Sequence, residues 1–189
     1  MNKVDEIRII EQVKQGDLLA FRLLVDKYKT MAFHIALQVV RNTEDAEEIA
    51  QDAFLKSYQS ISKFKGESKF STWLYKIVYN LAISKTRKKR IEISNIDETE
   101  ISDFEIAAAY EEYSHLEKEE RILQLDQAIK KLKEDESLII SLFYINENSV
   151  EEISEITNLG ISNVKVKLHR ARKKLFQLLG EFKTIDKEI

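Results

Sequence analysis

Hydrophobic positions in the N-terminal half of the chain recur at intervals of three and four, which predicts a series of amphipathic helices. A first stripe ends before Gly16, and a second begins at Phe21 and continues or restarts at Ala32. Strand-like alternation is hard to find. The residues that we expect to face a core in these two stripes are Val4, Ile7, Ile10, Val13, Phe21, Leu24, Val25, Tyr28, Ala32, Ile35, Ala36 and Val39.

The next two predicted helices have clear boundaries. Asn42 has the character of an N-cap, and Glu44 and Asp45 follow in the first turn, where the helix dipole favours acids. That helix buries a stripe from Ala46 to Ile61 and is ended by Gly66. On a helical wheel of 100° per residue, apolar residues of the following helix form one ordinary core stripe. Its members are Phe70, Leu74, Ile77, Val78 and Leu81.

Residues 149–175, SVEEISEITNLGISNVKVKLHRARKKL, have the layout of a helix-turn-helix. Val150, Ile153 and Ile156 face inward on the first helix, and the segment TNLG at 157–160 makes the turn, where Asn158 tolerates a left-handed backbone. The second helix buries Ile161, Val164, Leu168, Ala171 and Leu175. The residues expected to face away from that core are Ser162, Asn163, Val166, Lys167, Arg170 and Lys173.

Composition supports an all-α fold. The 189 residues include no Pro and only four Gly, so helix breakers are few. The formal net charge of −3 hides blocks of charge. Residues 85–90 and 165–174 are basic without an acid, whereas residues 91–120 carry eleven acids against one Lys. We therefore predict two small helical domains, at about 1–90 and 117–182, joined by an acidic flexible linker at 91–116.

The stretch KFSTWLYKIVYN at 69–80 combines rings with positive charge. On the helical wheel Tyr75 and Tyr79 lie off the core stripe, and Lys76, Asn80 and Arg87 group on the other flank with Trp73 at its border. We therefore expect an exposed aromatic face beside a basic flank. Aromatic faces stack on unpaired bases and cations neutralise phosphates, so this surface suits melted or single-stranded nucleic acid.

Several kinds of chemistry have no support in the sequence. There is no Cys, and His34, His115 and His169 have no partner at metal-ligand spacing. No phosphate-binding Gly-rich loop and no nucleophile motif occurs. We therefore expect no enzyme activity, no cofactor and no metal. The charged start MNKVDEIR lacks the apolar core of a signal peptide, and no apolar run reaches membrane-spanning length. The expectation is a soluble cytoplasmic protein without membrane insertion.

Three motifs together resemble the extracytoplasmic-function (ECF) RNA polymerase sigma factors over almost the whole chain. They are NTEDAEEIAQDAF at 42–54, FKGESKFSTWLYKIVYN at 64–80 with its basic tail, and the helix-turn-helix through LHRARKKL at 168–175. The resemblance implies a sigma region 2 bundle, a sigma region 4 helix-turn-helix, and two partners, core RNA polymerase and promoter DNA. The family also commonly has an inhibitory anti-sigma factor.

The resemblance also implies roles for residues at matching positions. Glu48, Gln51 and Asp52 match the segment that docks on the polymerase. The loop at 65–70 and the helix after it match the part that recognises the −10 element and captures its melted bases. The second helix of the helix-turn-helix matches the reader of the duplex −35 element. The expected −10 residues are Lys69, Trp73, Tyr75, Lys76, Tyr79, Asn80 and Arg87, and the expected −35 residues are Ser162, Asn163, Lys165, Val166, Lys167, His169, Arg170 and Lys173.

Two other functions fit part of the sequence. A helix-turn-helix regulator that binds duplex DNA alone leaves the aromatic residues at 73–80 and the Glu48–Gln51–Asp52 patch without a role. An all-α adaptor that binds protein through exposed aromatics leaves both basic blocks unexplained. A promoter-specificity subunit of RNA polymerase accounts for all of these features.

Overall fold

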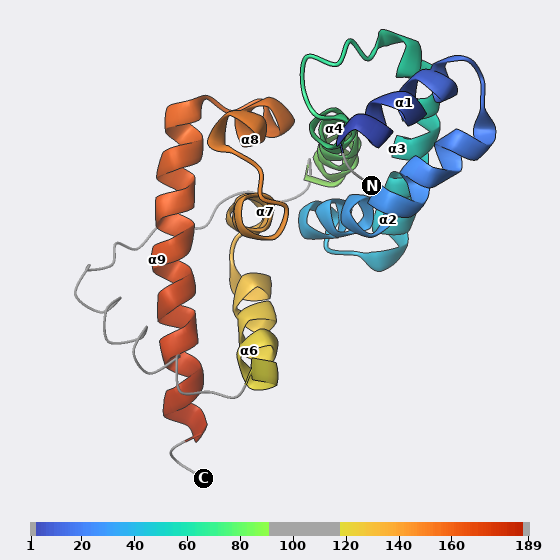
Figure 1. The fold of residues 1–189 in the computed structure, drawn as a ribbon. Coiled ribbons are helices and arrows are strands. Elements are labelled where there is room, and N and C mark those ends of the chain that lie inside the picture. Colours follow the sequence, from blue (N-terminus) through green and yellow to red (C-terminus); the bar gives the residue numbers. More distant parts are fainter. Residues whose placement is uncertain (1–2, 91–117, 187–189) are drawn as a thin grey trace. The chain divides into compact units, whose positions relative to one another are not determined.

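The computed structural model describes residues 3–90 and 118–186, and all regular structure in these ranges is helical (Figure 1). This agrees with the predicted all-α class. The described chain divides into two compact units, one built on α1–α4 and the other on α6, α7 and α9. The acidic linker predicted at 91–116 lies outside the described residues.

The N-terminal unit is organised around α2 (Leu18–Val40), which packs against α1 (Lys3–Lys14), α3 (Thr43–Ser60) and α4 (Phe70–Arg90). Helix α3 also packs on α4, and a short 3-10 turn, η1 (Ile61–Lys63), follows it. The second predicted stripe is therefore one uninterrupted helix and does not restart at Ala32.

Side-chain caps fix where α2 and α3 begin. The Asp17 carboxylate accepts from the backbone N–H groups of Leu19 and Ala20 at 2.8 and 3.1 Å. Helix α2 ends at Arg41, whose φ of 53° is left-handed. The next residue, Asn42, accepts from the Asp45 N–H at 2.8 Å, which confirms the predicted N-cap. These caps set the sharp reversal that brings α3 back along α2.

The core of the N-terminal unit contains most of the predicted positions. Ile10, Val13, Leu24, Ile35 and Val39 are buried, as expected from the helical period. Ile7 was predicted to be in the core and is 56% exposed, so that prediction is wrong. Ile7 lies toward the start of α1, and the buried apolar residues of this helix are Ile9, Ile10 and Val13.

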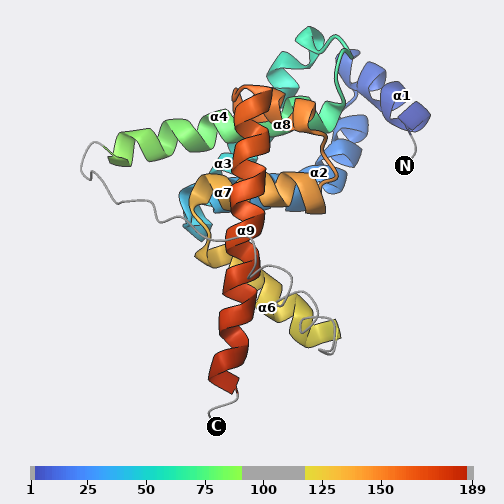
Figure 2. The ribbon, with the colours of Figure 1, turned by 90° about the vertical axis from the view of Figure 1, so that its left-hand side faces the viewer.

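The C-terminal unit consists of α6 (Lys118–Lys131), α7 (Glu134–Ile140), a π-helical turn η2 (Ser141–Ile145) and the long helix α9 (Ile161–Asp186), shown along its length in Figure 2. Helices α6 and α7 both pack on α9. The buried apolar residues of these helices and of the turn between α6 and α7 include Ala128, Leu132, Leu138, Ile139, Ile140, Val164, Leu168 and Ala171.

The two helices of the predicted helix-turn-helix are present as α8 (Val150–Thr157) and the start of α9. Ile153 and Ile156 are buried as expected. Asn158 has a φ of 58°, which confirms the left-handed turn. The Gly160 carbonyl accepts from the Val164 N–H at 3.0 Å and so begins α9. Ile161 is 43% exposed, so its predicted core position is wrong; it stands in the first turn of α9, where Ser162 and Asn163 are exposed as well.

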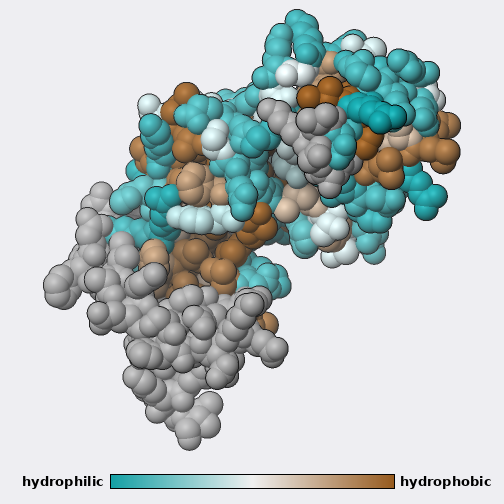
Figure 3. Space-filling model, viewed as in Figure 1, coloured by the Kyte–Doolittle hydropathy of each residue, from teal (hydrophilic) through white to brown (hydrophobic). Residues whose placement is uncertain are grey.

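Apolar side chains also remain on the surface. The face in Figure 3 carries hydrophobic areas among hydrophilic ones. Leu18, Leu19 and Leu55 are more than half exposed. No helix within the described ranges combines the length and the apolar character that a membrane crossing requires.

Candidate nucleic-acid and polymerase interfaces

The buried face of α4 is rotated relative to the sequence prediction. Phe70, Leu74 and Val78 are buried as predicted. Ile77 and Leu81, also predicted to be in the core, are only half-buried, whereas Tyr75 and Ala82 are buried instead. With 100° per residue, the centre of the buried apolar and aromatic side chains lies about 50° from the centre of the predicted stripe.

Tyr75 explains this rotation. It was predicted to lie on an exposed aromatic face, and that prediction is wrong because only 5% of the residue is exposed. Its ring meets the Tyr28 ring of α2 edge to face, with centroids 6.3 Å apart and an interplanar angle of 83°. Burial, with the nearby charge of Glu6, raises the pKa of the Tyr75 hydroxyl to about 12. Tyr75 is therefore a packing residue between α4 and α2.

A buried polar contact ties α1 to this packing. The Tyr28 hydroxyl donates to the Glu6 carboxylate, and the Lys27 ammonium lies 3.0 Å from the same carboxylate. Burial, followed by the hydrogen bond to Glu6, raises the pKa of the Tyr28 hydroxyl. Because Tyr28 also contacts Phe70 and Tyr75, Glu6 is linked through Tyr28 to the packing of α4.

Four of the expected −10 residues share the outer face of α4. Trp73, Lys76, Asn80 and Arg87 fall within about 60° of one another on the wheel, and their mean direction is about opposite to the buried face. Asn80 and Arg87 are exposed, and Trp73 and Lys76 are half-buried. Tyr79 is also half-buried but lies about 60° beyond Lys76, at the border with Tyr75. The structure thus places one ring, Trp73, within the polar-basic face.

Trp73 is held in place by two phenylalanines. Its ring centroid lies 5.3 Å from that of Phe64 and 5.7 Å from that of Phe70. Phe64 precedes the loop in which Gly66 has a φ of 76°, a left-handed conformation that glycine adopts without strain. Lys69, at the end of this loop, is exposed. Sequence reasoning missed the support from Phe64, because Phe64 lies outside α4 and a helical wheel of α4 does not include it.

The expected docking residues form a coherent surface on α3. Glu48, Gln51 and Asp52 are all exposed. Leu55 lies between them on the helical wheel and is 57% exposed. Sequence reasoning missed Leu55. The available signal was that Leu55 follows Asp52, Gln51 and Glu48 by three, four and seven residues, the spacing of residues on one helix face. An exposed apolar side chain ringed by polar ones is typical of a protein interface.

Lys85 connects α4 to this surface. Its ammonium lies 2.7 Å from Glu48 Oε2 and 2.9 Å from Asp45 Oδ1. The hydrogen bonds to Glu48 and Asp45 raise the pKa of the Lys85 ammonium. The first cation of the basic block at 85–90 is therefore engaged with α3, and Lys85 lies on the core-facing side of α4, away from Arg87.

The basic residues of α9 divide into two groups. Most of the expected −35 residues are exposed, in agreement with the predicted outward face. They are Ser162, Asn163, Lys165, Val166, His169 and Arg170. Lys173 is half-buried. Lys167 was predicted to face away from the core, but its ammonium contacts the Asp135 carboxylate of α7 and its side chain is only 28% exposed. The helical wheel of α9 alone contains no information about α7, so this pairing was not predicted.

The described residues contain no group of three or more His, Asp or Glu side chains arranged to hold a metal ion.

Comparison with known families now identifies the class of protein. The family model for sigma-70 region 2 matches residues 24–91, and the model for sigma-70 region 4 matches residues 122–175. The chain is 36% identical over 180 residues to the ECF RNA polymerase sigma factor SigW of Bacillus subtilis, covering 91% of this chain and 95% of that one. It is 32% identical to the ECF RNA polymerase sigma-E factor of Escherichia coli K12, covering 87% and 89%.

The chain therefore belongs to the ECF family of RNA polymerase sigma factors. It is a promoter-recognising subunit of RNA polymerase, acting as a transcription initiation factor.

Solved structures show the same fold. CnrH, solved in complex with the cytosolic domain of CnrY, is 22% identical with a TM-score of 0.64, covering 94% of this chain and 97% of that one. RpoE of Bartonella quintana, solved in complex with the anti-sigma factor NepR, is 22% identical with a TM-score of 0.62, covering 85% and 96%.

Proposed function

We propose that the outer face of α4 holds unpaired −10 bases and so promotes strand opening. The observation that supports this most directly is the grouping of Trp73 with Lys76, Asn80 and Arg87 opposite the buried face of the helix. A double helix hides the faces of its bases, so a ring can stack on a base only after the strands separate. Lys76 and Arg87 supply charge for the phosphates, and Lys69 extends it into the loop.

The burial of Tyr75 changes its role in this proposal. We now assign Tyr75 to packing that holds α4 against α2, whereas Tyr79 stays at the edge of the base-binding face. The stacking ring is Trp73, which Phe64 and Phe70 hold in place. A ring positioned before binding loses little freedom when a base stacks on it, which favours capture.

The exposed start of α9 is proposed to read the −35 duplex. Residues near the N-terminal end of a helix-turn-helix reader approach base edges, and cations farther along contact phosphates. Ser162 and Asn163 stand near the N-terminal end of the helix, where they can approach base edges, and Val166 is available for apolar contact. The residues placed to contact phosphates are Lys165, His169, Arg170 and Lys173, together with Lys167 once it is released from Asp135.

The exposed patch on α3, formed by Glu48, Gln51, Asp52 and Leu55, is proposed to dock on core RNA polymerase. Polar side chains around an apolar centre give the layout of a protein interface, in which the centre supplies most of the affinity. Catalysis of RNA synthesis belongs to the polymerase, and the chain itself contributes binding.

The remaining assignments follow from the family. We propose domains at 1–90 and 117–182 joined by a linker at 91–116, and the spans of the two family matches support this division. An anti-sigma partner is proposed because a protein of this fold, RpoE of Bartonella quintana, is held by one. The site of action is proposed to be the cytoplasm, where the polymerase works.

Run-off transcription separates this function from its alternatives. Core RNA polymerase is assayed on a promoter fragment with and without the chain, and the account predicts transcripts from one start site only when the chain is present. A stand-alone regulator would bind duplex DNA equally well without core and would not confer promoter-dependent initiation on it. An all-α adaptor would bind neither the duplex DNA nor core RNA polymerase.

The reading of the −35 element has its own test. Asn163→Ala should lower affinity mainly for the cognate base pair, because a base-edge contact is worth roughly 1–3 kcal/mol and depends on position. Lys165→Ala should lower affinity for all sequences and flatten the salt dependence. Unchanged affinity in both variants, measured across salt with single-base duplex variants, would remove α9 from the reading role.

A further inference from the structure

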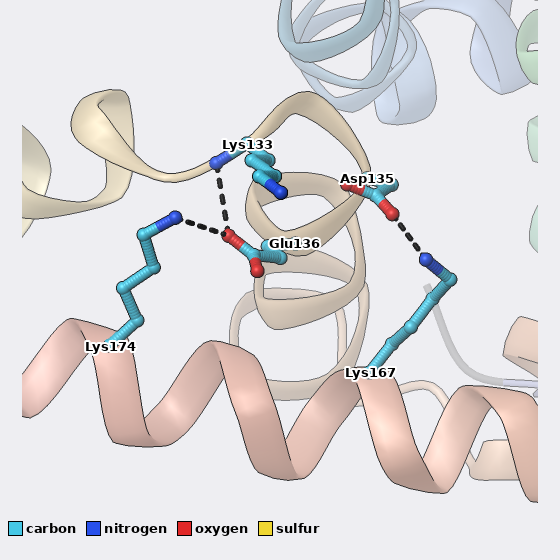
Figure 4. A network of polar contacts seen from close by, with 5 residues as sticks. All are labelled: Lys133, Asp135, Glu136, Lys167 and Lys174. Carbon is cyan, nitrogen blue, oxygen red and sulfur yellow. Dashed lines mark hydrogen bonds and ion pairs between the residues drawn. The ribbon is translucent and has the colours of Figure 1, made fainter. Parts of the chain in front are cut away.

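Two neighbouring acids at the start of α7 each hold one lysine of α9 (Figure 4). The Lys167 ammonium donates to Asp135 Oδ2. The Lys174 ammonium lies 3.3 Å from Glu136 Oε2, which also accepts from the Lys133 backbone N–H at 3.1 Å. Glu136 therefore serves both the start of α7 and the contact with α9, whereas the side-chain partner of Asp135 is Lys167.

The positions of these lysines separate them from the reading face. Lys167 and Lys174 are seven residues apart, which is close to two helical turns, so both lie on the side of α9 that α7 covers. Lys165 and His169, by contrast, lie on exposed positions. In the basic block of 165–174, the charges of Lys167 and Lys174 are thus matched by acids of α7.

The Asp135–Lys167 pair is placed where DNA competes for it. About half of the Asp135 side chain is exposed, and Lys167 stands one turn after Asn163 in the proposed reading helix. Although burial raises the pKa of the Asp135 carboxyl, the hydrogen bond and charge of Lys167 outweigh it, so the pKa is lowered and Asp135 is ionised at neutral pH. A lysine held by a carboxylate offers less charge to a phosphate.

We propose that Asp135 holds Lys167 away from the DNA backbone and thereby limits the sequence-independent affinity of the reading helix. The proposal rests on the proposed function of α9 as the −35 reader. It assigns to Asp135, a residue outside the helix-turn-helix, a positioning role in DNA binding. Phosphate contacts supply nearly all non-specific affinity, so withholding one of them reduces binding to DNA that lacks a promoter.

The test uses the full chain and two labelled duplexes of equal length, one carrying a −35 element from a promoter transcribed by the holoenzyme and one of scrambled sequence. Wild type, Asp135→Asn, Lys167→Ala and the double variant are titrated at several salt concentrations. Glu147→Gln is the control, because it removes one acid from an exposed position of the same unit. Helicity is checked by circular dichroism, and Asp135→Ser replaces Asp135→Asn if the latter does not fold.

The expected result is that Asp135→Asn binds both duplexes more tightly and makes the slope of log affinity against log salt more negative by about 0.9, the value for one phosphate contact. The gain in affinity should therefore shrink roughly 3- to 4-fold between 50 and 200 mM salt. Lys167→Ala in the Asp135→Asn background should abolish the gain, and Glu147→Gln should show no slope change.

Two results would overturn the restraint and leave the reading function intact. One is an unchanged slope in a folded Asp135→Asn chain that still binds DNA. The other is a slope flattened by about 0.9 in Lys167→Ala alone, because Lys167 would then already contact phosphate in the wild type. If instead neither Asn163→Ala nor Lys165→Ala changes the affinity for any duplex, the reading function of α9 fails, and the restraint fails with it.

Discussion

The ammonium of Lys85 lies 2.7 Å from a carboxylate oxygen of Glu48, so the basic end of α4 is tied to the helix that we propose docks on the polymerase. Arg87, two residues farther along, is exposed on the opposite side of α4. We therefore propose different roles for these neighbouring cations: Lys85 packs α4 on α3, and Arg87 belongs to the proposed DNA face.

Exchange of each cation for methionine tests this division. Lys85→Met leaves Glu48 and Asp45 without their cation, so we expect a lower denaturation midpoint and normal opening of the promoter by assembled holoenzyme. Arg87→Met should leave the midpoint unchanged and reduce opening. Trp73, the chain's only Trp, lies in the N-terminal unit and reports its unfolding by fluorescence. The reverse pattern would place Lys85 on the DNA and Arg87 in the packing.

Leu55 provides a test of the docking surface. Leu55→Ser should weaken binding to core RNA polymerase by about tenfold or more, because an apolar centre supplies most of the affinity of an interface. The matched control is Leu19→Ser, since Leu19 is 76% exposed on α2 and lies outside the proposed surface. Competition against a labelled sigma factor measures both affinities. Equal affinity of the Leu55 variant and wild type would exclude this face of α3 as the docking site.

Tyr75 should behave as a core residue. Tyr75→Ala removes a buried ring and is expected to lower the free energy of unfolding by about 3–5 kcal/mol. Tyr75→Phe keeps the ring against Tyr28 and should remain folded, and it should open promoters normally. Denaturant titration followed by Trp73 fluorescence measures the difference. A Tyr75→Ala chain as stable as wild type would contradict the packing role.

The Asp135–Lys167 pair predicts a dependence of stability on pH. The folded-state pKa of Asp135 is lowered, so the pair contributes stability above the ordinary value of 3.8, and this contribution is lost as pH falls through the lowered pKa. Asp135→Asn should therefore be less stable than wild type at pH 5–7, by no more than about 1 kcal/mol because the pair is partly exposed. Once the pH is below the lowered pKa of Asp135, the two thermal unfolding curves should converge. A difference that persists in acid would mean that the pair is not its source.

Local patterns predicted much of the fold because they depend on neighbouring residues. The N-cap at Asn42 and the left-handed Asn158 follow from the chemistry of single side chains, and the sequence motifs pointed to both DNA-binding regions. The errors arose where a different helix decides the environment. Tyr75 is buried by Tyr28, 47 positions earlier in the chain, and Lys167 is paired by Asp135 of another helix. A helical wheel treats each helix alone, so it predicts the width of a buried face better than its direction.

Trp73 has the central role in the proposed strand opening by the outer face of α4. The most direct measurement is the permanganate reactivity of promoter thymines with holoenzyme that contains Trp73→Ala, compared with Trp73→Phe, which keeps a ring. Both variants are checked for helicity and for binding to core polymerase. The account predicts that Trp73→Ala binds core polymerase and the −35 duplex but loses thymine reactivity, because stacking is worth roughly 1–3 kcal/mol per base. Trp73→Phe should retain most reactivity, and a pre-melted bubble should restore transcription to Trp73→Ala. Normal thymine reactivity in a folded Trp73→Ala holoenzyme would contradict base capture by this face of α4.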